Sequence, residues 1–394
     1  MTTKALERKL GELFSFKNGR GFGKDEWAAT GLPIIRIQNL NSPEALFNHF
    51  SGEYSLDILV ERGDLLFSWS GTVGSSFGPH IWDREPGLLN QHIFKISIRA
   101  EVEPRYAYFA LKQITAAIEE AVSGAVGLVH ITKEKLTAFT IPVPPLSEQR
   151  RIVGILDEAF EGLATAKANA EKNLQNARAL FESHLNAVFT QRGDGWVETT
   201  LGEMATFRNG INFTKSSRGQ SVKIVGVKDF QKHFWAPMEG LDTVTTEGTL
   251  PDSDTLKEGD LLFVRSNGNM ELIGRSILVG PIVDKVTHSG FTIRARFSRS
   301  GVLPKYVCRF LKSNTARRKM IDSGIGTNIK SLNQTTLSVL VVPVPPVAEQ
   351  TRIAVQFETI EAETQGLESI YQCKLAALDE LKKSLLHRAF SGEL

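Results

Sequence analysis

The sequence predicts an α+β fold in which two α/β globular domains are separated by two long helices that pair as an antiparallel coiled coil. Three observations predict it. The chain has 394 residues, which exceeds the usual size of a single domain. Its second half repeats motifs of its first half, and each half ends in a long proline-free stretch with a heptad pattern. We therefore expect an internal repeat with a pseudo-twofold axis.

The repeat is carried by five pairs of short segments. They match in order and in rough spacing, and the last pair keeps a constant offset of 201 residues. Collinear matches of this kind are not expected by chance, so both halves should share one architecture. The matched segments are Leu10-Gly11-Glu12 with Leu201-Gly202-Glu203, Asn18-Gly19 with Asn209-Gly210, Gly63-Asp64-Leu65-Leu66-Phe67 with Gly259-Asp260-Leu261-Leu262-Phe263, Pro104-Arg105-Tyr106 with Pro304-Lys305-Tyr306, and Pro142-Val143-Pro144-Pro145 then Glu148-Gln149 with Pro343-Val344-Pro345-Pro346 then Glu349-Gln350.

Each Pro-rich strip separates a globular segment from a helix, because proline lacks a backbone donor and pushes the preceding residue to extended geometry. No proline follows from Ser147 to Phe189 or from Ala348 to Phe390, and apolar residues recur there in 3-4 alternation. This pattern predicts two coiled-coil helices of roughly 60 Å each. Asn173 and Lys374 fall at matching seam positions, where a polar residue either fixes the register or marks an exposed spot. The expected seam residues are Ile152, Leu156, Ala159, Leu163, Ala166, Ala170, Ala177 and Leu180, then Ile353, Phe357, Ile360, Leu367, Tyr371, Leu378, Leu381 and Leu385.

The segments outside the helices are rich in glycine and in short β-branched runs such as Ile34-Ile35-Arg36-Ile37, which predicts mixed α/β domains. Short helices are predicted from Arg105 to Val122 and from Lys305 to Ile321, each after a proline and before a Ser-Gly stop. The expected order is a first domain (1–146), a spacer helix (147–189), a second domain (190–347) and a second spacer helix (348–394).

Composition argues against several classes of protein. The longest apolar runs fall far short of the roughly 20 residues that span a bilayer, and the start has no apolar signal segment, so we expect a cytoplasmic protein. Two cysteines, Cys308 and Cys373, occur without a zinc-binding spacing, so no metal site is expected. The net charge of +2 divides into −1, −1, +7 and −3 over the four segments, which places the basic excess in the second domain.

The paired Pro-Val-Pro-Pro strips, each followed by Glu-Gln and a long heptad helix, resemble those of the specificity subunits of type I restriction-modification systems, the HsdS family. The resemblance covers the whole chain. The first copy departs from the element before the second strip, so either His130 or Lys133 could fill the role of Lys330. Supporting details are Gly326-Thr327-Asn328-Ile329-Lys330-Ser331-Leu332, which the first copy replaces by Gly127-Leu128-Val129-His130-Ile131-Thr132-Lys133, and the helix endings Ala187-Val188-Phe189 and Arg388-Ala389-Phe390-Ser391-Gly392-Glu393-Leu394.

The resemblance implies two target recognition domains that each read one half of a split site in double-stranded DNA. It also implies that the helices are spacers and docking surfaces for two methyltransferase subunits. In that family the methyltransferase subunits use S-adenosylmethionine, and restriction subunits, joined through the complex, use ATP and magnesium. The resemblance therefore implies that this chain performs no catalysis and binds no cofactor. No contact with a membrane is expected either, because the apolar runs are short.

Motifs of catalysis and nucleotide binding are missing or incomplete. The Asn/Asp-Pro-Pro-aromatic tetrapeptide of amino-methyltransferases does not occur. The glycine cluster from Asn18 to Asp25 lacks the first glycine and the Ser/Thr of a phosphate-binding loop, which favours a tight turn near DNA over nucleotide binding. Asp157-Glu158-Ala159 mimics part of a helicase box, but it lies on a heptad helix and is interpreted as a solvated face.

DNA reading requires cations for phosphates and forked polar side chains for base edges, with Arg suited to guanine and Asn or Gln to adenine. Arg265-Ser266-Asn267-Gly268-Asn269 follows the repeated Gly-Asp-Leu-Leu-Phe strand, where the first copy has Ser68-Trp69-Ser70-Gly71-Thr72. Because the strand repeats and the loop diverges, two domains of one fold could read different bases here. The alternative is an ordinary polar turn.

The remaining candidate contacts are basic, amide and imidazole side chains. The basic excess of the second domain favours nucleic acid through counterion release, although most of these residues could be plain surface charge. The first domain offers local contacts without a broad field. The second domain provides Arg208, Asn209, Lys215, Arg218, Lys223, Lys228, Arg294, Arg296, Arg299, Asn328 and Lys330. The first domain provides Lys17, Asn18, Arg20, Arg36, Gln38, Asn39, Asn90, Gln91, His92, His130 and Lys133.

Two other interpretations are open at this point. One is an enzyme such as a solitary DNA methyltransferase, against which the missing tetrapeptide argues. The other is a coiled-coil scaffold that binds protein only, which the basic second domain and the divergent loops make less favoured.

Overall fold

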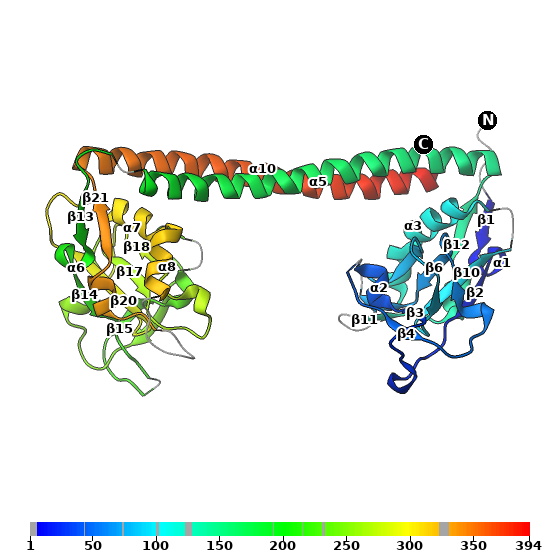
Figure 1. Ribbon diagram of the computed structural model, residues 1–394, viewed down its shortest axis with the longest axis horizontal. Helices are drawn as coiled ribbons and strands as arrows, with labels where there is room; N and C mark the ends of the chain where they lie inside the picture. The colour runs from blue at the N-terminus through cyan, green and yellow to red at the C-terminus, as the bar shows by residue number, and fades with distance from the viewer. Residues whose placement is uncertain are drawn as a thin grey trace. The chain divides into compact units, whose positions relative to one another are not determined.

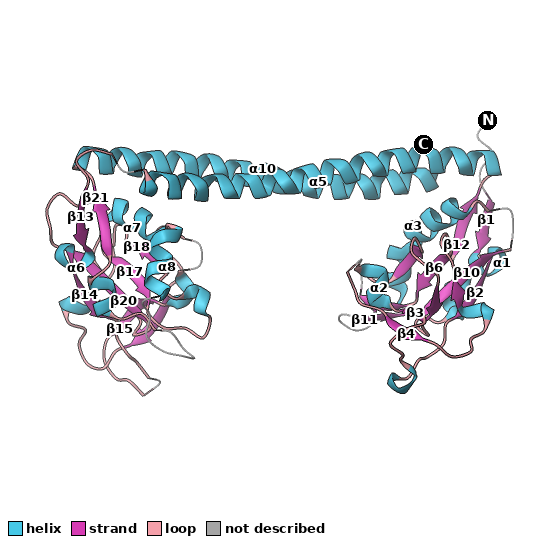
Figure 2. Cartoon of the chain, in the orientation of Figure 1, coloured by secondary structure: helices cyan, strands magenta, loops and turns pink. Residues whose placement is uncertain are grey.

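The computed structural model describes residues 6–42, 44–72, 75–99, 102–122, 128–191, 193–214, 216–230, 233–322 and 331–394. They form two compact units, unit 1 from Met1–Ala170 with Lys374–Leu394 and unit 2 from Glu171–Cys373. Each unit therefore combines one globular domain with about half of each long helix. Figure 2 shows strands and helices mixed within each globular domain, as expected of an α+β fold. No described helix is long and apolar enough to span a membrane.

Unit 1 is built on two four-stranded sheets, with strand orders β2-β10-β6-β8 and β4-β3-β9-β5, and on the two-stranded pairs β1-β12 and β11-β7. Its strands are β1 (Leu6–Lys9), β2 (Phe14–Asn18), β3 (Leu32–Ile35), β4 (Asn48–Phe50), β5 (Leu59–Val60), β6 (Leu65–Ser68), β7 (Ser70–Thr72), β8 (Gly78–Ile81), β9 (Gly87–Leu89), β10 (Ile93–Ile98), β11 (Leu128–His130) and β12 (Thr140–Val143). Its helices are α1 (Leu10–Leu13), α2 (Ile37–Asn41), α3 (Pro104–Val122) and α4 (Lys133–Ala138), with the 3₁₀ turns η1 (Lys24–Glu26) and η2 (Leu56–Ile58).

The repeated Gly-Asp-Leu-Leu-Phe motif is strand β6, which is covered on both faces. Leu65 and Phe67 pack in the core with α3 and the first turns of the helix α5 (Leu146–Thr190), whereas Leu66 faces the core beneath the other sheet. Alternate residues of a strand point to opposite faces, so a strand buried on both sides reads as a continuous apolar run. Figure 1 shows α3 between α5 and this sheet.

Unit 2 repeats this plan with the sheet order β14-β20-β17-β18, the three-stranded sheet β16-β15-β19 and the pair β13-β21. Its strands are β13 (Val197–Thr200), β14 (Ala205–Asn209), β15 (Ser221–Val225), β16 (Asp242–Thr245), β17 (Leu261–Val264), β18 (Ser276–Leu278), β19 (Val286–His288), β20 (Thr292–Phe297) and β21 (Val341–Val344). Its helices are α6 (Leu201–Met204), α7 (Pro304–Lys312), α8 (Asn314–Asp322) and α9 (Gln334–Ser338), with the 3₁₀ turns η3 (Val227–Asp229), η4 (Asp252–Asp254) and η5 (Met270–Leu272).

The short helix expected over Lys305 to Ile321 is wrong in one respect, because the chain breaks it into α7 and α8 at Ser313. Ser313 is fully buried and extended, with φ −65° and ψ 149°. Its Oγ accepts a hydrogen bond of 3.3 Å from the Ala316 N–H, as an N-cap serine does. In unit 1, α3 runs unbroken over the predicted range and begins one residue earlier.

A repeated joint ties each globular domain to its long helix, and the Glu-Gln motif supplies its central residue. Gln149 Oε1 accepts from the Glu103 N–H at 2.9 Å, and Gln350 Oε1 accepts from the Leu303 N–H at 2.8 Å. Both glutamines are buried. Their Nε2 groups donate to carbonyls of the Pro-rich strips, so the glutamine satisfies backbone groups that proline leaves without helical partners.

The strips themselves form β12 and β21, which pair with β1 and β13. The hydroxyls of Tyr106 and Tyr306 donate to the carbonyls of Pro142 and Pro343, at 2.8 and 2.5 Å. Prolines fit these strands because each belongs to a two-stranded ribbon, where one side of the strand needs no ladder. The strip, the tyrosine and the glutamine together fix the direction in which the helix leaves the domain.

The long helices α5 and α10 (Val347–Ser391) are 45 residues each, and their segments are antiparallel within each unit. In unit 1 the Lys167 ammonium pairs with Asp379 at 2.9 Å, and Arg151 donates to the Leu394 carbonyl at 2.6 Å. In unit 2 the Arg178 guanidinium pairs with Glu368 at 3.0 Å. Positions early in one helix therefore meet positions late in the other.

The expected seam is wrong at Leu180, Leu367 and Leu381, whereas the other predicted positions are buried or partly buried, including Ala177, Tyr371, Leu378 and Leu385. Leu180, Leu367 and Leu381 are exposed by 55%, 38% and 47%. Asn173 and Lys374 are exposed too, whereas the following residues, Leu174 and Leu375, are partly buried. A straight α-helix drifts by about 20° per heptad relative to a strict heptad repeat, so the match is lost at some later positions while Ala177, Tyr371 and Leu378 stay on the buried side. The polar pair therefore lies off the seam and does not set its register.

Candidate nucleic-acid interface

The repeated Asn-Gly pair lies at the end of a strand, β2 in unit 1 and β14 in unit 2. Its glycine packs against the backbone of the turn that precedes β10 or β20. A Cβ on Gly19 would lie 2.2 Å from the Leu89 carbonyl oxygen, and a Cβ on Gly210 would lie 2.2 Å from that of His288. Only glycine permits this approach, which accounts for the motif at both sites. A three-residue 3₁₀ turn follows the glycine cluster in unit 1. It is too short to offer a phosphate the N-terminus of a helix, so the geometry favours the tight turn.

In unit 1 this arrangement gathers several of the predicted DNA-contact residues at one end of the sheet. A surface hollow of about 330 Å³ is lined by Arg36, Asn90, Gln91 and His92, together with Trp27 and neighbouring residues. The Trp69 ring lies beside it, with its centroid 5.4 Å from that of His92. We call these residues with His130 the first sheet-end cluster: Arg36, Trp69, Asn90, Gln91, His92 and His130.

Trp69 is the centre of this cluster. Its ring meets His130 edge-on at a centroid distance of 4.5 Å, and the Ser70–Thr72 strand pairs with Leu128–His130. Trp69 Nε1 and His92 Nδ1 are buried without a hydrogen-bond partner among the described residues. Native structures rarely leave such groups unpaired, and where they do a functional reason is common. Because Ser70–Thr72 pair with Leu128–His130, the segment after β6 is strand β7 in unit 1, where a loop was expected.

Not every predicted residue of unit 1 is available to a ligand. Asn39 is 1% exposed, and its amide bonds the Arg36 N–H and the carbonyls of Ala45 and Leu46. The Ser68 hydroxyl is buried and donates to the Ser70 carbonyl at 2.9 Å. These two side chains stabilise the local backbone, so we exclude them from the residues that could contact DNA.

The cations of unit 1 are mostly partnered. Lys17 pairs with Asp57 at 2.6 Å, and Arg20 pairs with Glu26 at 2.7 Å. The Arg20 guanidinium also lies 4.4 Å from the Phe22 ring centroid. The Arg20 pairing and a bond from the Gly23 N–H lower the pKa of the Glu26 carboxyl, the backbone bond having the larger effect. Asn18 and Gln38 are accessible at the surface, as are Thr72 and Lys133.

Unit 2 forms an equivalent cluster from different residues. The Arg265 N–H donates to the Phe291 carbonyl at 2.8 Å, and its Nη1 donates to the Gly290 carbonyl at 3.4 Å. Phe291 is 62% exposed. Gln334 Nε2 donates to Asn209 Oδ1 at 3.1 Å beside the Gly210 turn. We call this set the second sheet-end cluster: Asn209, Arg265, Ser266, Phe291 and Gln334.

The loop after Arg265 is folded by its own amides. Asn267 Oδ1 accepts from the Asn269 N–H at 2.8 Å, and Asn269 Oδ1 accepts from the Glu271 N–H at 2.9 Å. These are Asx turns, which leave both Nδ2 groups as donors at the surface. The polar-turn interpretation therefore accounts for the shape of the loop, and base contact by the two asparagines is compatible with it.

Trp69 and Arg265 occupy one structural position. Trp69 N–H donates to His92 and its carbonyl accepts from Ile131, while Arg265 N–H donates to Phe291 and its carbonyl accepts from Leu332. The preceding strands have the same register against β10 and β20. The same backbone thus presents an aromatic ring in one unit and a forked cation in the other.

Several basic residues of unit 2 are bound within the protein. Arg294 is 5% exposed and donates to the carbonyls of Ser253 and Thr255. Arg296 makes a two-pronged ion pair with the buried Asp260, which raises the pKa of its guanidinium. These two arginines hold strand β20 to the segment from Ser253 to Asp260, so we exclude them from the residues that could contact DNA. Burial, with neighbouring arginines, lowers the pKa of His288 to about 3, so it is neutral here.

The surface cations Lys223 and Lys228 pair with Asp284 and Asp242, both at 2.6 Å, and Arg208 pairs with Asp254. The two lysine pairs are exposed on both sides, and exposed pairs of this kind are weak enough for phosphate to replace the carboxylate. Arg299 donates to the Thr199 hydroxyl at 3.0 Å, and Arg218 is exposed. Lys215, Asn328 and Lys330 lie outside the described residues. Among the residues that are described, no group of His, Cys, Asp and Glu is placed to hold a metal ion.

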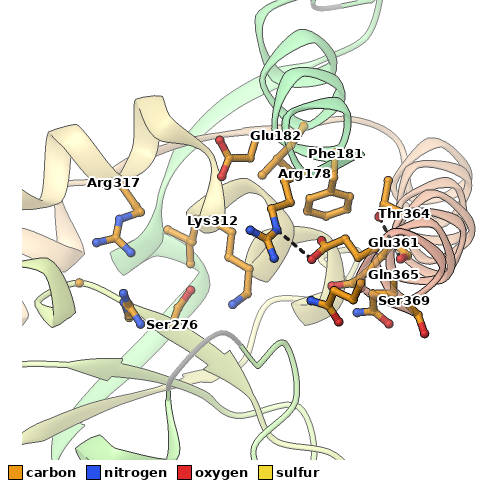
Figure 3. A pocket seen from close by; sticks show the side chains of 16 residues that line it. Arg178, Phe181, Glu182, Ser276, Lys312, Arg317, Glu361, Thr364, Gln365 and Ser369 are labelled. Atoms are coloured by element: carbon orange, nitrogen blue, oxygen red, sulfur yellow. Dashed lines mark hydrogen bonds and ion pairs between the residues drawn. The ribbon is translucent and has the colours of Figure 1, made fainter. Parts of the chain in front are cut away.

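A separate cavity of about 640 Å³ lies in unit 2 between the long helices and the α7–α8 region. Figure 3 shows Arg178 and Glu182 from α5, Lys312 and Arg317 from the globular domain, and Glu361 from α10 around it. Several of its polar groups are bound within the protein, because Arg178 pairs with Glu368, Arg317 donates to the Glu271 carbonyl and Lys312 donates to the His233 carbonyl at 2.8 Å. We therefore assign it no part in the interface.

The family model described as the type I restriction modification DNA specificity domain matches residues 4–174 and again residues 193–372. The two matches together cover most of the chain. This chain belongs to that family. The double match also coincides with the internal repeat, one copy for each globular domain with the helix that follows it.

Similar proteins agree with the family. The specificity subunit of the type I restriction enzyme EcoBI of Escherichia coli is 24% identical over 99% of this chain and 86% of its own length. The StySPI specificity subunit of Salmonella potsdam is 24% identical over 92% of this chain and 82% of its own. The HsdS subunit of Thermoanaerobacter tengcongensis has the same fold, with a TM-score of 0.62 at 17% identity over 100% of this chain and 98% of its own. A chain from a type I restriction-modification assembly aligns with a TM-score of 0.76 at 18% identity, covering 100% of this chain and 99% of the other.

Sequence reasoning missed Phe291, Gln334 and Trp27. Phe291 could have been found from the repeat, because it lies opposite His92 when the two copies of the sheet are aligned. Trp27 carried no spacing signal; the Arg36 guanidinium lies 5.8 Å from its ring centroid only in the folded chain. Gln334 meets Asn209 across 125 residues of sequence, which no local pattern could reveal.

Proposed function

We propose that this chain is the DNA-sequence specificity subunit of a type I restriction-modification complex, in which each sheet-end cluster reads one half of a bipartite site in double-stranded DNA. The observation that carries the proposal is the shared position of Trp69 and Arg265. One backbone frame presents different side chains, as two readers of different half-sites require. The chain supplies specificity, and it performs no catalysis.

The second sheet-end cluster suits a G-containing half-site. The Arg265 fork can bond the two acceptors of guanine in the major groove, and the exposed Phe291 ring beside it can contact a thymine methyl group. The first sheet-end cluster combines the amides of Asn90 and Gln91, suited to adenine, with the Trp69, His92 and His130 rings. Each good bidentate contact is worth about 1–3 kcal/mol of discrimination.

In this proposal the long helices set the spacing between the two readers. At 1.5 Å per residue, a helix of 45 residues is about 68 Å long, which exceeds the 34–36 Å of one DNA turn. The helices also dock two methyltransferase subunits, and restriction subunits join through the complex. S-adenosylmethionine, ATP and magnesium are used by those partners, and this chain binds none of them.

The test is modified-base sequencing of genomic DNA from the host with and without this gene. A split methyladenine motif with a fixed gap should be present with the gene and disappear without it. The same motif persisting after deletion would contradict the proposal. Reintroducing the gene should restore the motif, which controls for effects on the neighbouring methyltransferase gene.

A further inference from the structure

The outer edges of the two central sheets are covered differently in the two units. In unit 2 residues Phe234 to Ala236 lie along β18: the Leu278 N–H donates to the Phe234 carbonyl at 2.9 Å, and the Ala236 N–H donates to the Leu278 carbonyl at 2.8 Å. Trp235 and Leu278 thereby form a parallel bridge. The segment adds a short extra strand to the sheet.

Three cations of α7 hold this added strand. The Lys312 ammonium donates to the His233 carbonyl at 2.8 Å. The Arg309 guanidinium lies 3.8 Å from the Phe234 ring centroid, and the Lys305 ammonium lies 5.6 Å from that of Trp235. The edge of β18 is therefore satisfied in its backbone groups and enclosed by side chains.

In unit 1 the equivalent edge is β8, and Ile81 takes the place of Leu278. Ile81 lies opposite Leu65 as Leu278 lies opposite Leu261. Pro79, two residues before Ile81, has no N–H. The Trp82 N–H donates to the Asp64 carbonyl, so Trp82 bonds across to the chain before β6. In an antiparallel pair alternate residues bond to the partner strand, and the residues between them point their N–H and C=O outward. The Ile81 N–H and C=O consequently face away from β6. No described residue forms a hydrogen bond with them.

The connection that covers the edge in unit 2 is shorter in unit 1. Thirteen residues separate Ile34 from Asn48, whereas seventeen separate Ile224 from Asp242. The shorter connection folds on itself through Asn39, which donates to the carbonyls of Ala45 and Leu46. Within the described residues it makes no hydrogen bond with β8.

Unit 1 nevertheless keeps two of the three cations that hold the added strand in unit 2, with Phe109 in place of Arg309. Lys112 matches Lys312 and has no ion pair or hydrogen bond with the described residues, and Arg105 matches Lys305. A hollow of about 350 Å³ beside the edge is lined by Ile81, Arg105, Tyr108 and His80, whose Nε2 is buried without a described partner. A second hollow of about 750 Å³ shares Arg105 and Tyr108 and reaches Phe109 and Lys112.

We propose that the β8 edge of unit 1 binds an extended segment of another protein, which adds a parallel strand at Ile81 and places an aromatic side chain in the adjoining hollow. Strand addition at an open edge is a common mode of peptide recognition, in which backbone bonds give affinity and pockets give specificity. The aromatic side chain packs against Phe109 and Tyr108, where unit 2 uses Arg309. The chain's own segment from His233 to Met238 is held at β18 in unit 2, and the proposed occupant of the β8 edge is a segment of a different polypeptide.

The test uses the full chain and a labelled probe peptide with the sequence of His233 to Met238, His-Phe-Trp-Ala-Pro-Met. Binding should be saturable, and hydrogen exchange should slow at the Ile81 amide. Ile81→Pro removes an outward-facing N–H, which an edge strand tolerates, together with part of a side chain that packs against the core, and it should weaken binding about tenfold. Ile81→Val is the matched control and should bind the peptide as the unaltered chain does.

Two further measurements keep the proposal testable if Ile81→Pro fails to fold. Lys112→Met should weaken binding several-fold, and a peptide N-methylated at its alanine, the counterpart of Ala236, should lose most of its affinity. No binding, binding that these changes leave intact, or slowed exchange elsewhere than β8 would overturn the proposal. Self-association of the chain that Ile81→Pro abolishes would also overturn it, because the occupant would then be a second copy.

Discussion

The joints of the two units use the same contacts near the Pro-rich strips and different contacts one helical turn later. Arg105 pairs with Asp157 in unit 1, and Lys305 pairs with Glu358 in unit 2. At the next turn unit 1 has Phe109 against Phe160, with ring centroids 5.5 Å apart, whereas unit 2 has Arg309 paired with Glu361 at 2.5 Å.

This difference shows which parts of the repeat must stay the same. The glutamine, tyrosine and strip contacts set the direction of the helix and recur in both units. Beyond them, the Phe109–Phe160 pair in unit 1 and the Arg309–Glu361 ion pair in unit 2 fill the same space, and Arg309 Nε has no hydrogen-bond partner among the described residues. The sheet ends diverge further, as expected where side chains contact a ligand. The predictions below test this division into shared and exchangeable parts.

The largest effect is expected at the ion pair of unit 2. Arg309→Ala removes a guanidinium that is 1% exposed and leaves Glu361 without its partner, so it should destabilise unit 2 by about 3 kcal/mol. Arg309→Phe with Glu361→Phe recreates the contact of unit 1 and should recover most of that loss. Urea-induced unfolding, monitored separately in each unit by hydrogen exchange, measures the stability of the single and the double variant. A double variant as unstable as the sum of its single changes would break the comparison.

The shared joint should respond alike in both units. Gln350→Ala leaves the Leu303 N–H and the carbonyls of Gly301 and Pro345 without a partner, and should cost about 2 kcal/mol. Gln149→Ala should cost a similar amount in unit 1, measured in the same unfolding experiment. If one joint proved indifferent to the change, the two would not be equivalent.

The sheet ends should respond separately. Arg265→Ala should relax one base position in one half-site, at a cost of about 1–3 kcal/mol of discrimination, and Trp69→Ala should affect only the other half-site. Competition binding of the assembled complex to single-base variants of the site measures both effects. Uniformly weaker binding to every sequence would reassign Arg265 to phosphate contact.

The smallest effect is expected from an exposed cation. Lys223→Ala should leave folding unchanged, because Lys223 and Asp284 are both well exposed. If Lys223 contacts phosphate, DNA affinity should fall equally for all sequences and the slope of log affinity against log salt should drop by about 1. An unchanged slope would place Lys223 outside the DNA interface.

The repeat, the long helices and the α+β fold could be read from the sequence because each depends on local spacing. The exposure of Leu180, Leu367 and Leu381 could not, because the drift of a straight helix against a heptad repeat accumulates over several turns. Arg294 and Arg296 were predicted to contact DNA, since no local sequence pattern indicates that Asp260 and the carbonyls of Ser253 and Thr255 bind them. Phe291 was missed for the opposite reason: an apolar residue directly before a strand predicts burial, and this one, just before β20, is exposed.

The central claim is that two independent readers share one repeated frame. The most direct test replaces residues 190–347 with the second domain of another family member and maps the methylated motif in the host by modified-base sequencing. The account predicts that one half of the motif changes, while the other half and the gap between them stay as they were. A change in both halves would contradict it.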